Sequence, residues 1–129
     1  MLATISSGFL VATTLVVALF QVALALGAPW GAYAYGGART GKLPIGFRIN
    51  SVFAAIVMVA ISGHYLAQLG VFTPLLDQAG NSIVNWALVG FTGLGAVVNN
   101  ITRSKLERAA WGVPTILMFI AALFVALYR

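Results

Sequence analysis

The stretch ISSGFLVATTLVVALFQVALAL, residues 5–26, contains no charged residue, and Gln21 is its one strongly polar side chain. A helix needs about 17–25 residues to cross the hydrocarbon core of a bilayer. In lipid, every backbone N–H and C=O group must be hydrogen-bonded within the segment, which makes a helix the expected structure. Residues 5–26 therefore predict a membrane-spanning helix.

Three further apolar stretches follow, at residues 49–72, 81–98 and 105–128, and the third of the four stretches is the shortest. The whole chain is 61% hydrophobic and only 7% charged. A soluble domain carries about 25% charged residues, so this chain has too little charge to cover a water-facing surface. We predict one all-α domain over residues 1–129, a bundle of four transmembrane helices with the lipid bilayer as its main partner.

The basic residues predict how the bundle is oriented. They occur in the loops after the first and the third apolar stretch, at Arg39, Lys42, Arg48, Arg103, Lys105 and Arg108. The loop after the second stretch has no basic residue, and its one charged residue is Asp77. Because cytoplasmic loops are enriched in Lys and Arg, we expect both basic loops to be cytoplasmic and both termini to lie outside.

Aromatic residues cluster near the ends of the apolar stretches, among them Trp30, Tyr33, Tyr35, Trp86 and Trp111. Such amphipathic rings favour the headgroup level of a bilayer, so we interpret them as interfacial anchors. The residues between 27 and 44 are too apolar for a free linker. We expect this loop to lie along the membrane surface.

The motif Ser104-Lys105-Leu106-Glu107 predicts where the fourth helix begins. In a capping box of this S-x-x-E form, the serine side chain accepts a hydrogen bond from the backbone N–H of the glutamate. The glutamate side chain in turn accepts from the backbone N–H of the serine. We therefore interpret Glu107 as a cap that pairs with Arg103 or Arg108. A proton-relay role for Glu107 is the alternative.

Small residues predict which helices pack most closely, because they allow backbones to approach in a membrane. They recur at helical spacing at Ser51, Ala55, Gly63, Ala67, Ala87, Gly90, Gly93 and Ala96. These positions belong to the second and third stretches. We therefore expect those two helices at the centre of the bundle.

Polar side chains inside a bilayer are costly, so each is a candidate functional residue. The candidates are Gln21, Arg48, Asn50, His64, Gln68, Asn85, Asn99, Asn100 and Glu107. For His64 we favour a hydrogen bond to Asn85 or Gln68 over proton handling or ligand binding. The polar residues at the basic end form either a cytoplasmic vestibule or caps and lipid-headgroup contacts.

The residue types that most often act as acids or bases in catalysis are nearly absent. The chain has one His, one Asp, one Glu and no Cys. Within the predicted membrane spans there is no Ser-His-Asp set, no pair of carboxylates and no cluster of metal ligands. We expect no enzymatic activity, no metal site and no cofactor, and the basic residues beside apolar stretches indicate membrane and not nucleic acid.

Two motifs carry a resemblance to known proteins. One is GAPWG-x-YA-x-GG at residues 27–37, followed by Leu43-Pro44. The other combines Asn99 or Asn100 with Ser104, Glu107-Arg108 and Trp111. Together they resemble a family of small four-transmembrane-helix bacterial membrane proteins. This resemblance implies a bacterial plasma (inner) membrane and a four-helix bundle, and it implies no catalytic residue.

Three functions are compatible with these features. The first is a non-enzymatic accessory or scaffold subunit, or a self-associating module, suggested by the small residues. The second is a small oligomeric transporter or channel for an ion or small solute, suggested by the polar residues within the spans. The third is a lipid or anion binder that uses the basic residues at the cytoplasmic face.

Overall fold

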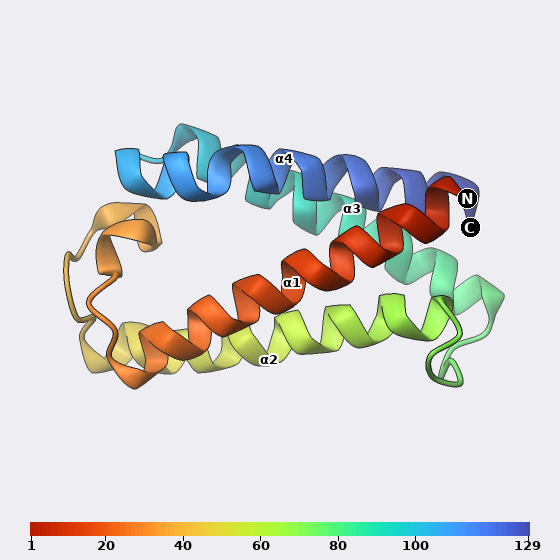
Figure 1. Cartoon of the computed structure of the whole chain (residues 1–129), viewed down its shortest axis with the longest axis horizontal. Helices are drawn as coiled ribbons and strands as arrows, with labels where there is room; N and C mark the ends of the chain where they lie inside the picture. Colours follow the sequence, from red (N-terminus) through yellow and green to blue (C-terminus); the bar gives the residue numbers. More distant parts are fainter.

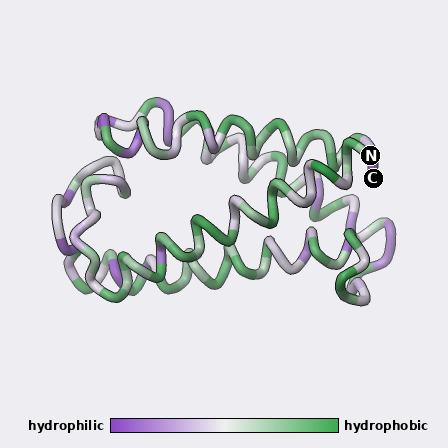
Figure 2. Tube along the Cα trace, in the orientation of Figure 1, coloured by the Kyte–Doolittle hydropathy of each residue, from purple (hydrophilic) through white to green (hydrophobic).

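The computed structural model describes residues 1–129 and confirms an all-helical protein. Its helices are α1 (Leu2–Leu26), α2 (Ile45–Gln68), α3 (Gln78–Ile101) and α4 (Lys105–Tyr128), as Figure 1 shows. Each of the four is long and apolar enough to cross a membrane. Hydrophilic residues gather at the two ends of the bundle (Figure 2), as expected for a chain whose middle lies in lipid.

The start of α4 agrees with the sequence prediction, because the Ser104 hydroxyl accepts from the Glu107 N–H at 3.0 Å. The predicted limits of α2 were wrong. This helix begins at Ile45, directly after Pro44, and it ends at Gln68 before Gly70 adopts a φ of +85°. Apolar loop residues after Gln68 extended the hydrophobic stretch without extending the helix.

The limits predicted for α1 and α3 were also too narrow. Helix α1 already begins at Leu2, and α3 spans Gln78–Ile101. The Asp77 carboxylate caps α3 by accepting from the Gly80 N–H at 2.8 Å. Both ends of α3 contain polar residues. A prediction from hydropathy alone therefore makes this helix too short.

The helices form two antiparallel hairpins, α1 with α2 and α3 with α4, and the hairpins meet through α1 and α4. The prediction that α2 and α3 form the centre of the bundle was wrong. Gly63 and Gly90 have open space where a side chain would begin. Helices α1 and α4 are central instead, and small buried residues such as Ser7, Ala18 and Ala122 lie on them.

The four helices pack tightly in the half of the bundle that contains the termini. The core there combines side chains from all four helices, namely Leu10, Tyr65, Leu88, Met118, Ala121, Ala122 and Val125. Toward the other end the two hairpins diverge, and the loop between α1 and α2 lies across the gap (Figure 1). The basic end of the bundle is therefore the less tightly packed one.

The loop of residues 27–44 is folded against the bundle. It contains two short 3-10 turns, Gly31–Tyr33 and Tyr35–Gly37. The Gly31 N–H donates to the Gly41 carbonyl at 2.9 Å, and Ala34 and Leu43 pack on Leu24 of α1. The loop thus has a defined structure, while its expected contact with the membrane surface stays a prediction.

Candidate functional site

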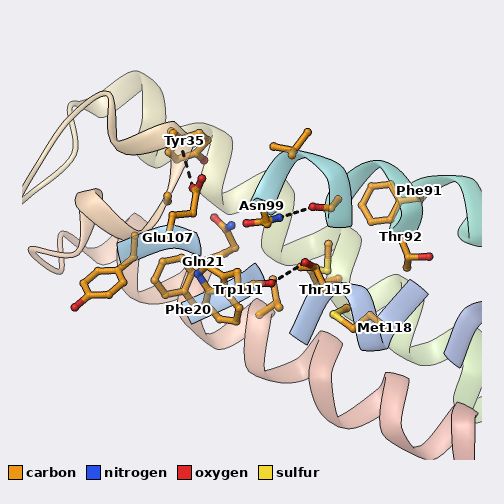
Figure 3. A pocket seen from close by; sticks show the side chains of 17 residues that line it. Phe20, Gln21, Tyr35, Phe91, Thr92, Asn99, Glu107, Trp111, Thr115 and Met118 are labelled. Carbon is orange, nitrogen blue, oxygen red and sulfur yellow. Dashed lines mark hydrogen bonds between the residues drawn. The ribbon is translucent and has the colours of Figure 1, made fainter. Parts of the chain in front are cut away.

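A cavity of about 400 Å³ lies between the two hairpins at the basic end (Figure 3). All four helices and the loop contribute to its lining. Ligand pockets in proteins typically enclose about 300–1,000 Å³ and are mostly apolar with a few polar groups. The lining fits that description, because aromatic and aliphatic side chains surround a small number of polar ones.

Glu107 is the one acidic side chain of the cavity, and no Lys, Arg or His lines it. Only 5% of Glu107 is exposed. Its Oε2 accepts from the Gly36 N–H at 3.3 Å, whereas its Oε1 is buried and has no hydrogen-bond partner in the protein. One oxygen of this cavity-lining carboxylate is thus an acceptor that no protein group uses.

The predicted role of Glu107 is corrected on two points. Its carboxylate does not accept from the backbone N–H of Ser104, because that N–H donates to the Thr102 hydroxyl at 3.2 Å. It also does not pair with the neighbouring cations: Arg108 donates to the Thr102 carbonyl, and the carboxylate accepts from Gly36. The negative charge is stabilised by the N-terminal end of α4, where the helix dipole favours anions.

Two amide side chains, Gln21 and Asn99, also line the cavity. The Gln21 Oε1 atom is buried and lacks a partner in the protein, as the Glu107 Oε1 atom does. The Asn99 amide nitrogen donates to the Gly95 carbonyl of its own helix at 2.7 Å. This bond leaves the Asn99 carbonyl oxygen as another acceptor at the cavity wall.

The loop places the Gly36 N–H against the carboxylate through an unusual backbone. Tyr35, Gly36 and Gly37 all have positive φ, and for Tyr35 the value is 52°. A non-glycine residue in this left-handed region carries a conformational cost. The Tyr35 hydroxyl holds the conformation in place, because it accepts from the Asn50 amide and shares a hydrogen bond with Ser51, both at 2.9 Å.

The cavity opens toward the surface beside α3. Phe91 and Val98 line it, yet they are 46% and 50% exposed. Helix α2 contributes Met58 to the opposite wall, and α2 packs mainly on α1. This surface is apolar and belongs to one of the four helices that are long and apolar enough to cross a membrane.

A second polar cluster, formed by His64, Gln68 and Asn85, lies in the tightly packed half. The Gln68 and Asn85 amides exchange two hydrogen bonds of 2.9 Å, and His64 Nε2 lies 2.8 Å from Asn85 Oδ1. The predicted hydrogen bond between His64 and Asn85 is formed. Because these groups satisfy one another, the cluster is best explained as a connection between α2 and α3.

The remaining candidates do not share one space, so a vestibule of Arg48, Asn50, Asn99 and Asn100 is not formed. Arg48 donates to the Ala25 carbonyl at 2.9 Å, at the end of α1. Asn50 holds Tyr35, and Asn100 connects α3 to α4 by donating to the Gly112 carbonyl at 3.0 Å. Of that set, only Asn99 lines the cavity.

The sequence prediction missed the aromatic wall of the cavity. Trp111, interpreted as an interfacial anchor, packs edge-on against Phe20 with ring centroids 5.0 Å apart. A signal was present in the spacing, because the lining residues Glu107, Trp111, Thr115 and Met118 follow one face of α4. That face leads from the buried acid into the bundle, and in Figure 3 it forms one wall of the cavity.

Comparison with models of protein families, with curated proteins and with solved structures finds no match for this chain. Any role of the cavity is therefore inferred from the residues that line it.

Proposed function

We propose that this protein is a non-enzymatic membrane protein that binds an amphipathic small molecule in the cavity at its basic end. The ligand enters from the lipid phase beside α3. One observation carries the proposal: Glu107 is buried at the wall of an apolar cavity, and one of its carboxylate oxygens has no hydrogen-bond partner in the protein.

Energetic reasoning supports a binding role. A buried acceptor without a partner costs about 1–3 kcal/mol, and more when it is charged. The chain keeps two such acceptors, on Gln21 and Glu107, at the same cavity. A ligand that donates hydrogen bonds to them while filling the apolar space recovers this cost, which gives affinity and orientation at once.

The absence of catalysis is part of the proposal. General acid–base catalysis most often uses His, and also carboxylates, Lys, Tyr or Cys, held within hydrogen-bond reach of the reacting atom. The titratable side chains of the lining are Glu107, Tyr33 and Tyr35, and no His, Lys or Cys accompanies them. We propose that these side chains hold a molecule and do not activate a nucleophile.

We place the protein in a bacterial plasma membrane with the cavity in its cytoplasmic half. The four apolar helices support a multi-pass membrane protein. The basic loops after α1 and α3 lie at the same end of the bundle, where they are joined by a hydrogen bond from the Ser104 hydroxyl to the Ala32 carbonyl. This shared end and the positive-inside tendency support a cytoplasmic assignment.

The accessory-subunit and transporter hypotheses remain predictions. Of the glycines that suggested close packing of α2 and α3, Gly63 and Gly90 have open space beside them, and Gly93 packs on Phe119 of α4. A transporter additionally requires the tightly packed half to open. A binding protein requires only the cavity described above.

Binding can be measured with the nitroxide 4-hydroxy-TEMPO, a compact apolar ring with one hydroxyl group, which quenches tryptophan on contact. Replacing Trp30 and Trp86 by Phe leaves Trp111, which lines the cavity, as the only tryptophan. In lipid nanodiscs we expect saturable quenching of Trp111. Quenching that rises linearly with probe concentration would show collision without binding and would contradict the proposal.

Two matched glycine substitutions on α3 locate the binding. Gly95 lines the cavity and Gly90 does not, and a Cβ atom added at either glycine would have no atom within 4 Å. Gly95→Leu fills the cavity and is expected to weaken binding about tenfold or more. Gly90→Leu brings the same gain in helix propensity and is expected to leave binding unchanged. Equal effects of the two changes would refute binding in the cavity.

A further inference from the structure

We infer that the head group recognised in this cavity is an organic ammonium ion attached to an apolar body. This inference rests on the proposed function and adds the chemical class of the ligand. The feature behind it is the combination of one buried carboxylate, two amide oxygens and aromatic rings in a space without any basic side chain.

The charge of the lining favours a cation. Glu107 accepts one neutral N–H and has a second oxygen free, so its negative charge is not balanced by a protein cation. Charge-assisted hydrogen bonds to a carboxylate are about twice as strong as neutral ones. They strengthen further where the surroundings are apolar.

The other acceptors match the donors of an ammonium group. A primary ammonium has three N–H donors and no acceptor. Glu107 Oε1 and Gln21 Oε1 are both buried without partners, and Asn99 supplies another oxygen at the same wall. A hydroxyl donates only once, and a carboxylate would be repelled by Glu107.

Aromatic rings add a third contribution. Phe20 and Trp111 pack against each other beside Gln21 and Glu107, as Figure 3 shows. Tyr33, Tyr35 and Phe91 also line the cavity. The faces of such rings attract cations, most strongly when the cation is removed from water.

The basic loops define the route of entry. The cations at this end lie outside the cavity: Arg48 bonds to Ala25 and Arg108 bonds to Thr102. Their positive charge disfavours approach of an ammonium ion from the aqueous side. An amphipathic amine already dissolved in the bilayer reaches the opening beside α3 without crossing them.

Three nitroxides with the same ring test the head group, namely 4-amino-, 4-hydroxy- and 4-carboxy-TEMPO. In the Trp111-only protein, at neutral pH in nanodiscs, we expect the amine to bind about tenfold more tightly than the alcohol. The carboxylate should bind most weakly. If the alcohol binds saturably and the amine binds no better, the ammonium inference is overturned while the proposed function stands. If no probe saturates, the proposed function fails first.

Charge-neutral substitutions assign the preference to Glu107. Glu107→Gln keeps an acceptor for Gly36 and is expected to abolish the preference of the amine over the alcohol. Asp77→Asn is the matched control, because Asp77 is the only other acid and caps α3 at the opposite end. It should leave the preference intact. Gln21→Leu, which retains Glu107, should lower amine affinity severalfold, and it provides an independent test if Glu107→Gln reduces stability.

The same chemistry has two natural sources, an amine free in the bilayer or the headgroup of phosphatidylethanolamine. Nanodiscs of phosphatidylglycerol alone can be compared with nanodiscs that also contain phosphatidylethanolamine. Competition by the added lipid, seen as a weaker apparent affinity for 4-amino-TEMPO, identifies the headgroup as a ligand. Unchanged affinity assigns the site to free amines. An amine affinity that is insensitive to Glu107→Gln in both lipid mixtures would overturn the inference.

Discussion

Glu107 shows how one side chain acquires a role that its sequence motif does not reveal. Its spacing from Ser104 correctly predicted the helix start, and half of the capping box is present. The other half is not formed, because the loop brings the Gly36 N–H to the carboxylate from 71 residues away in the chain. A local motif specifies a helix end, and the tertiary structure decides how the acid is used.

Ser104 can be tested separately because its hydroxyl makes two contacts. It accepts from the Glu107 N–H and donates to the Ala32 carbonyl of the loop. Ser104→Ala removes both, and we expect the free energy of unfolding to fall by about 1–2 kcal/mol. Unfolding in mild detergent with increasing denaturant measures the change.

Ser82→Ala is the control for that experiment, because Ser82 is exposed on α3 near its start. It should change stability by less than about 0.5 kcal/mol. Equal stability losses for the two variants would show that the cap and the loop contact contribute nothing specific.

At the scale of elements, the loop of residues 27–44 defines the closed end of the cavity. Gly31 is critical for its structure, because a Cβ atom there would lie 2.6 Å from the Arg39 carbonyl oxygen and 2.7 Å from that of Gly41. Both neighbours are backbone atoms, which cannot move without reshaping the loop. The glycine is therefore required by close approach, and its φ is not in the left-handed region.

We predict that Gly31→Ala loosens this loop. Overpacking of this kind costs about 1–3 kcal/mol. Hydrogen exchange should become faster at the amides of residues 31–43. Gly46→Ala is the control, because a Cβ atom at Gly46 would have no atom within 4 Å. Unchanged protection of the loop in Gly31→Ala would contradict the packing described here.

The sequence predicted the elements where the signal is local. The start of α4 was correct because Ser104 caps it, and residues 5–26 lie within α1. The end of α2 was misplaced because the following loop is also apolar, and only Gly70 marks the break. Hydropathy scores side chains, and it does not distinguish the apolar side chain of a loop residue such as Leu75 from that of a helical residue.

Packing between helices was harder to predict. Gly90 and Ala87 are exposed on α3, whereas Ser7 and Ala122 are fully buried. A small residue allows close approach but does not require it, because lipid fills the space equally well. The cavity could not be predicted either, because Gln21 and Glu107 are 86 residues apart in the chain and only the fold brings both into its lining.

At the scale of the whole molecule, the structure combines a tightly packed half with a divergent half that holds the cavity. The termini lie at the tightly packed end (Figure 1), and the basic loops lie at the other. This polarity predicts which end of the protein meets the cytoplasm.

The cysteine-free chain allows a direct test of orientation. Thr40 lies in the first basic loop and Thr73 in the acidic loop, and both are exposed. We expect Thr40→Cys to react with a membrane-impermeant maleimide only from the cytoplasmic side, and Thr73→Cys only from the outside. The reverse pattern would move the cavity to the outer half of the membrane.

The central claim is that an amphipathic molecule occupies the cavity, and photolabelling in native membranes tests it most directly. A hydroxyl-bearing alkyl diazirine is activated by light, and mass spectrometry then identifies the labelled residues. We predict labels on cavity-lining residues such as Phe20, Phe91, Trp111 and Met118, and their loss when 4-hydroxy-TEMPO is in excess. Labels confined to lipid-exposed residues such as Phe53 and Val113, and insensitive to the competitor, would contradict the claim.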